Sequence, residues 1–256
     1  MHHPNMLLRR TQVAWVLESN PRMPRLEEHA QHAPPQLHRR QLAEKLELAA
    51  FGARWLGRDA ETGGTVAPIP SEEDRALMAD PRRYGLHATL KPPFALASGA
   101  SVEALEAALA AFAALRAPVE LGYLQVTDLK GFLALCTPAR VPALHDLADD
   151  CVRAFDSFRA PSGEAELAKR RKAGLTPAQD AHLIAWGYPY VMEQFQFHVT
   201  LTQRLEPSTR ARIKRALEKH LRMILARPFV VTDLALFEEP APGADFILRR
   251  RFALGG

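Results

Sequence analysis

The sequence is poor in cysteine and contains no long apolar run, and both absences narrow its class. Only two cysteines, Cys136 and Cys151, occur among 256 residues, and both lie in apolar segments. They are too few for a disulfide framework or a thiolate metal site, so we expect a reducing, intracellular environment. No run of about 18 apolar residues is present, which argues against a membrane-spanning helix. The N-terminus also lacks the features of an export signal, so we expect a cytoplasmic protein.

The basic residues are dispersed along the chain, and dense runs of them are few. The net charge of +4 comes mostly from arginine, and the two dense basic runs are residues 169–172 and 249–251. We interpret each run as a solvated helix face or strand end. This balance favours anionic ligands but does not identify nucleic acid.

The first 48 residues differ in pattern from the rest of the chain. They hold five of the ten histidines, without the regular spacing of metal ligands, and show little periodicity. We expect a variable or poorly ordered segment at 1–48, although residues 11–17 could form a strand and residues 41–55 have helical spacing. Residues 49–256 are then expected to form a single domain, and at 47% hydrophobic composition the chain can bury a sizeable core.

The order of elements within this domain is duplicated. A strand around residues 86–90 is followed by a helix and two strands, and a run at 194–205 is followed by the same series. A helical insertion at about 141–187 separates the two series. We therefore predict an α+β fold of two pseudo-symmetric lobes, with antiparallel sheets, outer helices and a cleft between the lobes. The individual elements are expected at 101–116, 119–129, 131–137, 141–158, 163–172, 177–186, 207–226, 229–237 and 246–252.

Each half opens with the same short motif, His-x-Thr-Leu, at residues 87–90 and 198–201. Because side chains alternate along a strand, His87 and Thr89 should share one face, while the apolar neighbours occupy the other. The same alternation places His198, Thr200 and Thr202 on one face of the second strand. A single such motif is a weak signal, but two copies at matching positions indicate a shared site.

Two imidazoles and several hydroxyls facing one space suit phosphoryl chemistry. A histidine has an ordinary pKa near 6.5, so one imidazole can be neutral while its twin is protonated. The neutral ring would accept a proton from the attacking group, and the protonated ring would donate one to the leaving oxygen. The threonine hydroxyls would hold the phosphoryl oxygens. Zinc is the main chemical alternative, but no Asp, Glu or Cys accompanies either motif as a third ligand.

The two motifs resemble those of the two-histidine (2H) phosphoesterase superfamily, which includes RNA 2′,3′-cyclic phosphodiesterase and 2′–5′ RNA ligase-like proteins. Longer runs, such as DPRRYGLHATLKPPFALA and WGYPYVMEQFQFHVTLTQRL, are similar to proteins of unknown function found with phosphonate-degradation genes. This similarity extends from about Glu47 to the C-terminus. Relatives of this branch have a strand just before the segment matching residues 51–55, where this chain has a charged helical pattern. Residues 11–17 could supply that strand, or the first lobe could be perturbed.

The resemblance implies a cofactor-free, metal-independent enzyme that opens a cyclic phosphodiester, with His87 and His198 as the catalytic pair and Thr89 and Thr200 as phosphate holders. It implies a small cyclic phosphate ester or an RNA 3′ end as the partner. A non-catalytic binder of phosphorylated ligands or RNA ends, using the same cleft, is the alternative. Further candidates for substrate contact are Tyr84, Lys91, Thr202 and Tyr190.

Overall fold

The computed structural model describes residues 10–16 and 47–256. The α-helices with assigned bounds are α2 (Ala79–Arg82), α3 (Val102–Ala114), α4 (Pro142–Ala154), α5 (Glu164–Arg171), α6 (Pro177–Trp186) and α7 (Pro207–Leu221). Residues 47–56 are also helical, and short 3₁₀ turns are η1 (Arg75–Met78), η2 (Asp156–Phe158) and η3 (Met192–Gln194). The strands are β1 (Arg10–Val16), β2 (His87–Ala95), β3 (Val119–Gly122), β4 (Gln125–Leu129), β5 (Phe132–Cys136), β6 (Val199–Thr200), β7 (Phe229–Val231), β8 (Asp233–Glu239) and β9 (Ile247–Ala253).

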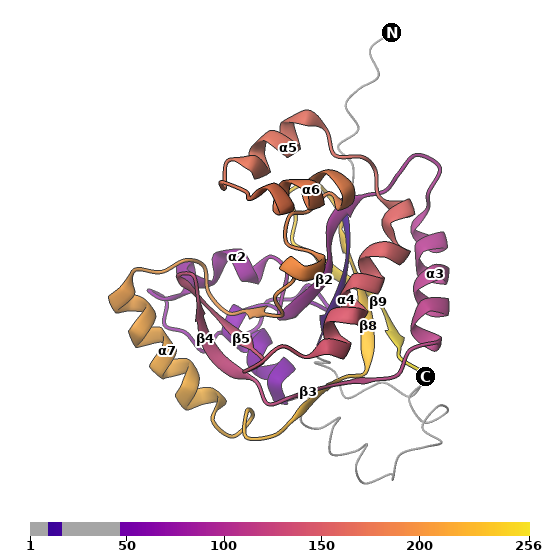
Figure 1. Cartoon of the computed structure of the whole chain (residues 1–256). Coiled ribbons are helices and arrows are strands. Elements are labelled where there is room, and N and C mark those ends of the chain that lie inside the picture. Colours follow the sequence, from indigo (N-terminus) through magenta and orange to yellow (C-terminus); the bar gives the residue numbers. More distant parts are fainter. Residues whose placement is uncertain (1–9, 17–46) are drawn as a thin grey trace.

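The strands form three antiparallel sheets, with orders β2-β1-β8-β9, β3-β7 and β4-β5-β6. Helices surround these sheets, and α7 lies beside β4 and β5 (Figure 1). The predicted α+β class with antiparallel sheets is therefore confirmed. No helix within the described ranges is both long and apolar enough to cross a bilayer.

The two large sheets exchange hairpins between the two halves of the sequence. The hairpin β4–β5 of the first half pairs with β6 of the second half, and the hairpin β8–β9 of the second half joins β1 and β2. The corresponding strands β3 and β7 pair with each other. Each large sheet thus combines elements from both halves, which keeps the halves from separating as independent units.

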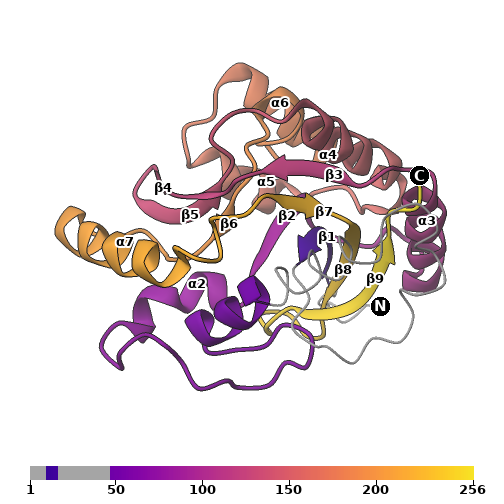
Figure 2. The same cartoon turned by 90° about the horizontal axis from the view of Figure 1, so that it is seen from below.

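Both motif strands lie at the edge of their sheets and next to each other. Among residues 10–16 and 47–256, β2 pairs only with β1 and β6 pairs only with β5. Cα atoms of β2 and β6 approach within 8 Å. Figure 2 shows β6 lying between β5 and β2. The exchange of hairpins therefore brings the two His-x-Thr motifs together from strands 111 residues apart in sequence.

Several strand bounds differ from the prediction. β2 continues through Pro92 and Pro93 to Ala95, because an edge strand tolerates residues that cannot donate to a neighbour. The predicted strand at 119–129 is divided, since Gly122 has a φ of 70° and turns the chain from one sheet to another. The predicted strand at 194–205 is reduced to the two residues of β6.

The N-terminal strand is an integral part of the fold. The strand predicted within residues 11–17 is confirmed as β1, which lies between β2 and β8. Relatives have a strand just before the segment that matches residues 51–55. In this chain β1, which lies further towards the N-terminus, can take that place. The remaining prediction for 1–48 falls almost entirely outside the described residues, and the predicted helix at 41–55 is described only from residue 47.

Of the predicted helical insertion, α4 belongs to the core. It packs against β2 and β3 and contributes buried side chains, including Leu144, Leu147 and Cys151. Helices α5 and α6 instead stand together at one end of the molecule (Figure 1). The predicted start of α6 is confirmed, because Thr176 and Gln179 form a reciprocal capping box.

Candidate functional site: two histidines on adjacent sheet edges

The side chains of both motifs alternate as a strand requires. His87 and Thr89 are partly exposed, and so are His198 and Thr200. Their apolar neighbours are buried on the opposite faces: Leu86, Ala88 and Leu90 in the first motif, and Phe197, Val199 and Leu201 in the second. Neither histidine is needed to complete the core.

The ring of His87 is fixed on several sides. Its Nδ1 lies 2.9 Å from the carbonyl oxygen of Gly85, and its Nε2 lies 3.1 Å from Oγ1 of Thr89. The ring of Tyr84 stacks on it, with centroids 5.3 Å apart. Because a carbonyl only accepts hydrogen bonds, Nδ1 of the neutral ring carries the proton and Nε2 is the acceptor.

His198 repeats this arrangement in the second motif. Its Nδ1 lies 2.8 Å from the carbonyl oxygen of Gln196, again two residues earlier in the chain. Phe132 meets the ring edge-on at a centroid distance of 5.9 Å. The same tautomer is therefore imposed on both histidines, and each offers Nε2 as the reactive nitrogen.

Both imidazoles have lowered pKa values. Burial, together with the charge of His198, lowers the pKa of His87 to about 4, although its bond to Gly85 acts in the opposite direction. Burial also lowers the pKa of His198. Both rings are therefore neutral at pH 7 in the free protein. Desolvation disfavours the charged form of each ring in the free protein, so the pair of one neutral and one protonated imidazole stays a prediction for the complex with substrate.

The lowered pKa of His87 makes stability depend on pH. Its pKa is about 6.5 in the unfolded chain and about 4 in the folded one, so the unfolded state binds more protons between these values. Stability present above pH 6.5 is lost as the pH falls towards 4. We expect wild type to lose about 2 kcal/mol more than His87→Gln between pH 7 and pH 4.5. Urea denaturation at both pH values measures this; equal losses in the two proteins would contradict it.

Two predicted substrate contacts are unavailable to a ligand. The hydroxyl of Thr202 is buried, where it accepts from the backbone N–H of Leu133 at 3.0 Å and donates to the carbonyl of Gln203 at 2.8 Å. Lys91 is only 1% exposed, and its Nζ donates to the carbonyl of Val152 at 3.1 Å and to Oδ1 of Asp156 at 3.2 Å. Thr202 and Lys91, which the sequence offered as possible substrate contacts, are therefore wrong as candidates.

The contacts of Lys91 predict a structural role that mutation can test. Asp156 also binds Arg159 through both carboxylate oxygens, so Lys91→Met leaves the carboxylate paired. We expect that variant to stay within about 1 kcal/mol of wild-type stability, whereas Asp156→Ala should cost about 2–3 kcal/mol by leaving a buried ammonium group without its counterion. Denaturant unfolding measures both. A larger loss for Lys91→Met than for Asp156→Ala would contradict this interpretation.

The two predicted tyrosines lie in different surroundings. Tyr84 is packed between His87 and Phe246, whose ring lies 4.8 Å from its own. Tyr190 is 40% exposed and meets Tyr188 edge-on at 5.6 Å. Burial raises the pKa of the Tyr188 hydroxyl, and the neighbouring Tyr190 and Tyr84 act in the same direction.

Two residues of the site were not predicted from the sequence. Gly85 has a φ of 74° and supplies the carbonyl that orients His87. A glycine two residues before the first motif is visible in the sequence and could have indicated this turn. Gln12 of β1 donates from Nε2 to Oγ1 of Thr89 at 2.7 Å. The role of Gln12 could not be predicted from the sequence, because 77 residues separate it from Thr89.

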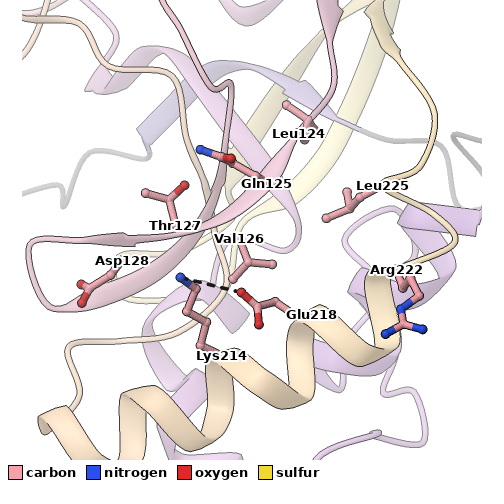
Figure 3. A pocket seen from close by; sticks show the side chains of 9 residues that line it. All are labelled: Leu124, Gln125, Val126, Thr127, Asp128, Lys214, Glu218, Arg222 and Leu225. Atoms are coloured by element: carbon pink, nitrogen blue, oxygen red, sulfur yellow. Dashed lines mark ion pairs between the residues drawn. The ribbon is translucent and has the colours of Figure 1, made fainter.

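Two surface hollows of the described residues are lined by side chains other than His87 and His198. One, of about 420 Å³, lies between β4 and α7, where Lys214 and Glu218 form an ion pair (Figure 3). Another, of about 480 Å³, is lined by Arg10, Arg83 and Glu239 among others. Arg83 also lies over the ring of Tyr84, which places this second hollow on the histidine side of the sheet.

Within the described ranges, no group of three or more His, Cys, Asp or Glu side chains could hold a metal ion. Cys136 and Cys151 are buried free thiols, and burial raises the pKa of both. The donor set around the motifs is therefore imidazole, hydroxyl and amide. Such groups bind and orient a phosphoryl group without a metal.

These features define an α+β protein with two histidine–threonine motifs on adjacent sheet edges. Residues 89–247 match the family described as "Protein of unknown function (DUF1045)", and the chain belongs to this family. The resemblance to a family of unknown function, inferred from the motifs and flanking runs, is thus confirmed.

Two curated proteins are similar in sequence. The chain is 39% identical over 217 residues to "Ribose 1,5-bisphosphate phosphokinase PhnN" of Janthinobacterium sp. (strain Marseille), which covers 81% of this chain and 48% of that protein. It is 40% identical over 208 residues to the protein of the same name from Laribacter hongkongensis (strain HLHK9), covering 78% and 47%. The chain spans about half the length of these curated relatives.

Solved structures show weaker similarity. "Crystal structure of phosphoesterase" shares 16% identity and a TM-score of 0.39, with 97% of this chain and 99% of that chain covered. E. coli LigT complexed with NADP+ shares 15% identity and a TM-score of 0.33, with 98% and 99% covered. TM-scores of this size do not establish a common fold.

Proposed function

We propose that this protein is a metal-independent phosphoesterase that opens a cyclic phosphodiester by paired histidine acid–base catalysis. The observation that carries this proposal is the matched pair of imidazoles. His87 and His198 lie on adjacent sheet edges, each holds its Nδ1 proton on the carbonyl two residues earlier, and each has a threonine two residues later.

In the proposed reaction, water attacks phosphorus and one P–O bond of the ring breaks. The neutral Nε2 of one imidazole takes a proton from the water, while the other imidazole donates a proton to the leaving oxygen. The lowered pKa values keep both rings unprotonated in the free protein, so either ring has a free nitrogen to accept a proton. A bound phosphodiester anion would raise the pKa of the neighbouring ring, so the substrate itself promotes the protonated form that serves as the acid.

Thr89 and Thr200 are the proposed phosphate holders. Each lies two residues after a histidine and on the same face of its strand, about 7 Å away between Cα atoms. Their hydroxyls would donate hydrogen bonds to the non-bridging oxygens and hold phosphorus between the two rings. Such positioning of the reacting groups lowers the barrier of the reaction. Tyr84 would keep the ring of His87 in its plane through stacking.

The proposed substrate is a ribose-derived cyclic phosphate, with an RNA 2′,3′-cyclic phosphate end as the second candidate. Both curated relatives carry a name that refers to ribose 1,5-bisphosphate, which supports a ribose phosphate as ligand. Only half of each relative matches this chain, so the named phosphokinase activity is not transferred to it. The resemblance to proteins found with phosphonate-degradation genes supports a role in phosphonate metabolism, in the cytoplasm.

Turnover of a panel of cyclic phosphodiesters, with EDTA present, tests this proposal. The panel should contain ribose 1,2- and 2,3-cyclic phosphates and short RNAs ending in a 2′,3′-cyclic phosphate. We expect ring opening of at least one ribose-derived member and no effect of EDTA on its rate. Tight binding without turnover of any member would instead identify a non-catalytic binder, and loss of turnover in EDTA would identify a metal enzyme.

A further inference from the structure

A buried amide supports the first motif but has no counterpart at the second. Gln12 of β1 is 1% exposed, and its Nε2 lies 2.7 Å from Oγ1 of Thr89. The same oxygen lies 3.1 Å from Nε2 of His87. Three side chains from two neighbouring strands therefore form one hydrogen-bonded chain.

The direction of every bond in this chain follows from the carbonyl of Gly85. That oxygen can only accept, so Nδ1 of His87 carries the ring proton and Nε2 is an acceptor. The hydroxyl of Thr89 must then donate its single proton to Nε2. Its oxygen is left to accept from the amide of Gln12, as the 2.7 Å contact allows. Thr89 thus covers the nitrogen that the proposed reaction needs.

We propose that Gln12 is a positioning residue that acts through Thr89: it holds the Thr89 hydroxyl on Nε2 of His87 in the free protein and keeps that oxygen in place when the hydroxyl turns to a bound phosphoryl group. This inference rests on the proposed function. Gln12 itself does not touch the reacting atoms.

The surroundings of Gln12 argue against a purely structural role. Among residues 10–16 and 47–256, Oε1 of Gln12 has no hydrogen-bond partner although it is buried. An apolar side chain would avoid this cost at the same position, since a buried acceptor without a donor is unfavourable. Thr89 lies opposite Ala14 of β1, and Thr200 lies opposite Ala134 of β5. Two residues before these alanines the chain has Gln12 on β1 but Phe132 on β5, whose side chain has no hydrogen-bond donor. The two motifs therefore differ at the residue that supports the threonine.

The other groups facing His87 are few and are left in place by changes at Gln12. The charge of His198, the residue just before β6, acts on the ring, and Tyr84 stacks on it from the segment before β2. Phe237 of β8 packs against it without a charge, and Arg83 lies on Tyr84. A shift in the titration of His87 after replacement of Gln12 by an uncharged residue can thus be assigned to Thr89.

The test measures the tautomer and titration of His87 by ¹H–¹⁵N spectra of the ring nitrogens in the unliganded full chain. In Gln12→Leu the Thr89 hydroxyl loses its anchor, and we expect the proton affinity of His87 to rise about 3–10-fold. In Gln12→Glu a carboxylate accepts the Thr89 proton and adds a negative charge, so the rise should be larger. The matched control is Thr11→Val, which removes a buried and unpaired hydroxyl from the adjacent position of β1.

Steady-state kinetics adds a second readout. We expect KM to rise about tenfold in Gln12→Leu with a smaller change in kcat, because the phosphate holder is displaced. If Gln12→Leu does not fold, Thr89→Val breaks the same bond without altering β1 and should raise the proton affinity of His87, while Thr89→Ser should restore it. An unchanged His87 titration in both Gln12→Leu and Thr89→Val would overturn the inference.

The two proposals can fail separately. Loss of turnover in His87→Ala with a titration insensitive to Gln12 would contradict the positioning role alone. A His87 titration that follows Gln12 while His87→Ala retains full turnover would contradict the proposed catalysis and leave the hydrogen-bonded chain intact.

Discussion

Replacing His87 with alanine is expected to lower turnover of the cyclic phosphodiester by about 10²–10⁴-fold, and His198→Ala should cause a loss of the same order. Each substitution removes the only imidazole of its motif, whose Nε2 would accept or donate a proton in the reaction. Neither ring completes the core, so both variants should fold. Single-turnover rates measured over pH 5–9 would separate the loss of the proton-transfer group from a change in binding.

The matched control for both substitutions is His182→Ala. His182 lies on α6, belongs to neither motif, and its Nε2 contacts Oε1 of Glu193 at 2.7 Å. Its removal should leave turnover unchanged. Wild-type turnover in His87→Ala or in His198→Ala, on every cyclic phosphodiester that the protein opens, would contradict paired catalysis.

Gly85→Ala should damage stability and activity together. The residue has a φ of 74°, and a Cβ there would lie 2.4 Å from Cβ of Ala60. The strained backbone and the overlap together should cost about 2–4 kcal/mol. The backbone must move to relieve the overlap, and the carbonyl that holds Nδ1 of His87 moves with it. We therefore expect turnover to fall at least tenfold at temperatures where the variant remains folded.

Gly99→Ala separates the cost of backbone strain from the cost of the overlap with Ala60. Gly99 has a φ of 83° but no atom within 4 Å of the added Cβ, so only the backbone strain of about 1 kcal/mol should appear. Thermal unfolding and turnover of the two variants give the comparison. Equal stability losses, or full activity in Gly85→Ala, would show that contact with Ala60 does not position His87.

The histidine pair could be predicted from the sequence because its signal is local and repeated. Alternation along a strand fixes the face of His87 and Thr89, and the second motif repeats it in the same frame. The class of fold follows from the order of strands and helices. The strand β1 could also be identified, but its central place between β2 and β8 could not, because a strand pattern does not name its partners.

The wrong predictions have the same physical origin. The partners of Lys91 lie 61 and 65 residues away in the sequence. The residues around the motif therefore give no indication that Lys91 is buried against α4 and η2. The alternation that placed Thr202 in the cleft ends with β6 at Thr200, after which the chain turns its hydroxyl to the backbone. The exchange of hairpins between halves likewise depends on distant pairing. Local periodicity specifies which face a residue occupies, and only the tertiary fold specifies what that face meets.

The central claim is that His87 and His198 bind one phosphoryl group together. Titration of inorganic phosphate into the full chain, followed by the ring ¹⁵N shifts of both histidines, tests this claim most directly. We predict that the pKa of each ring rises on binding, from about 4 for His87, and that both rises share one half-saturation concentration. A rise in only one ring, or two rises at different phosphate concentrations, would contradict a shared site.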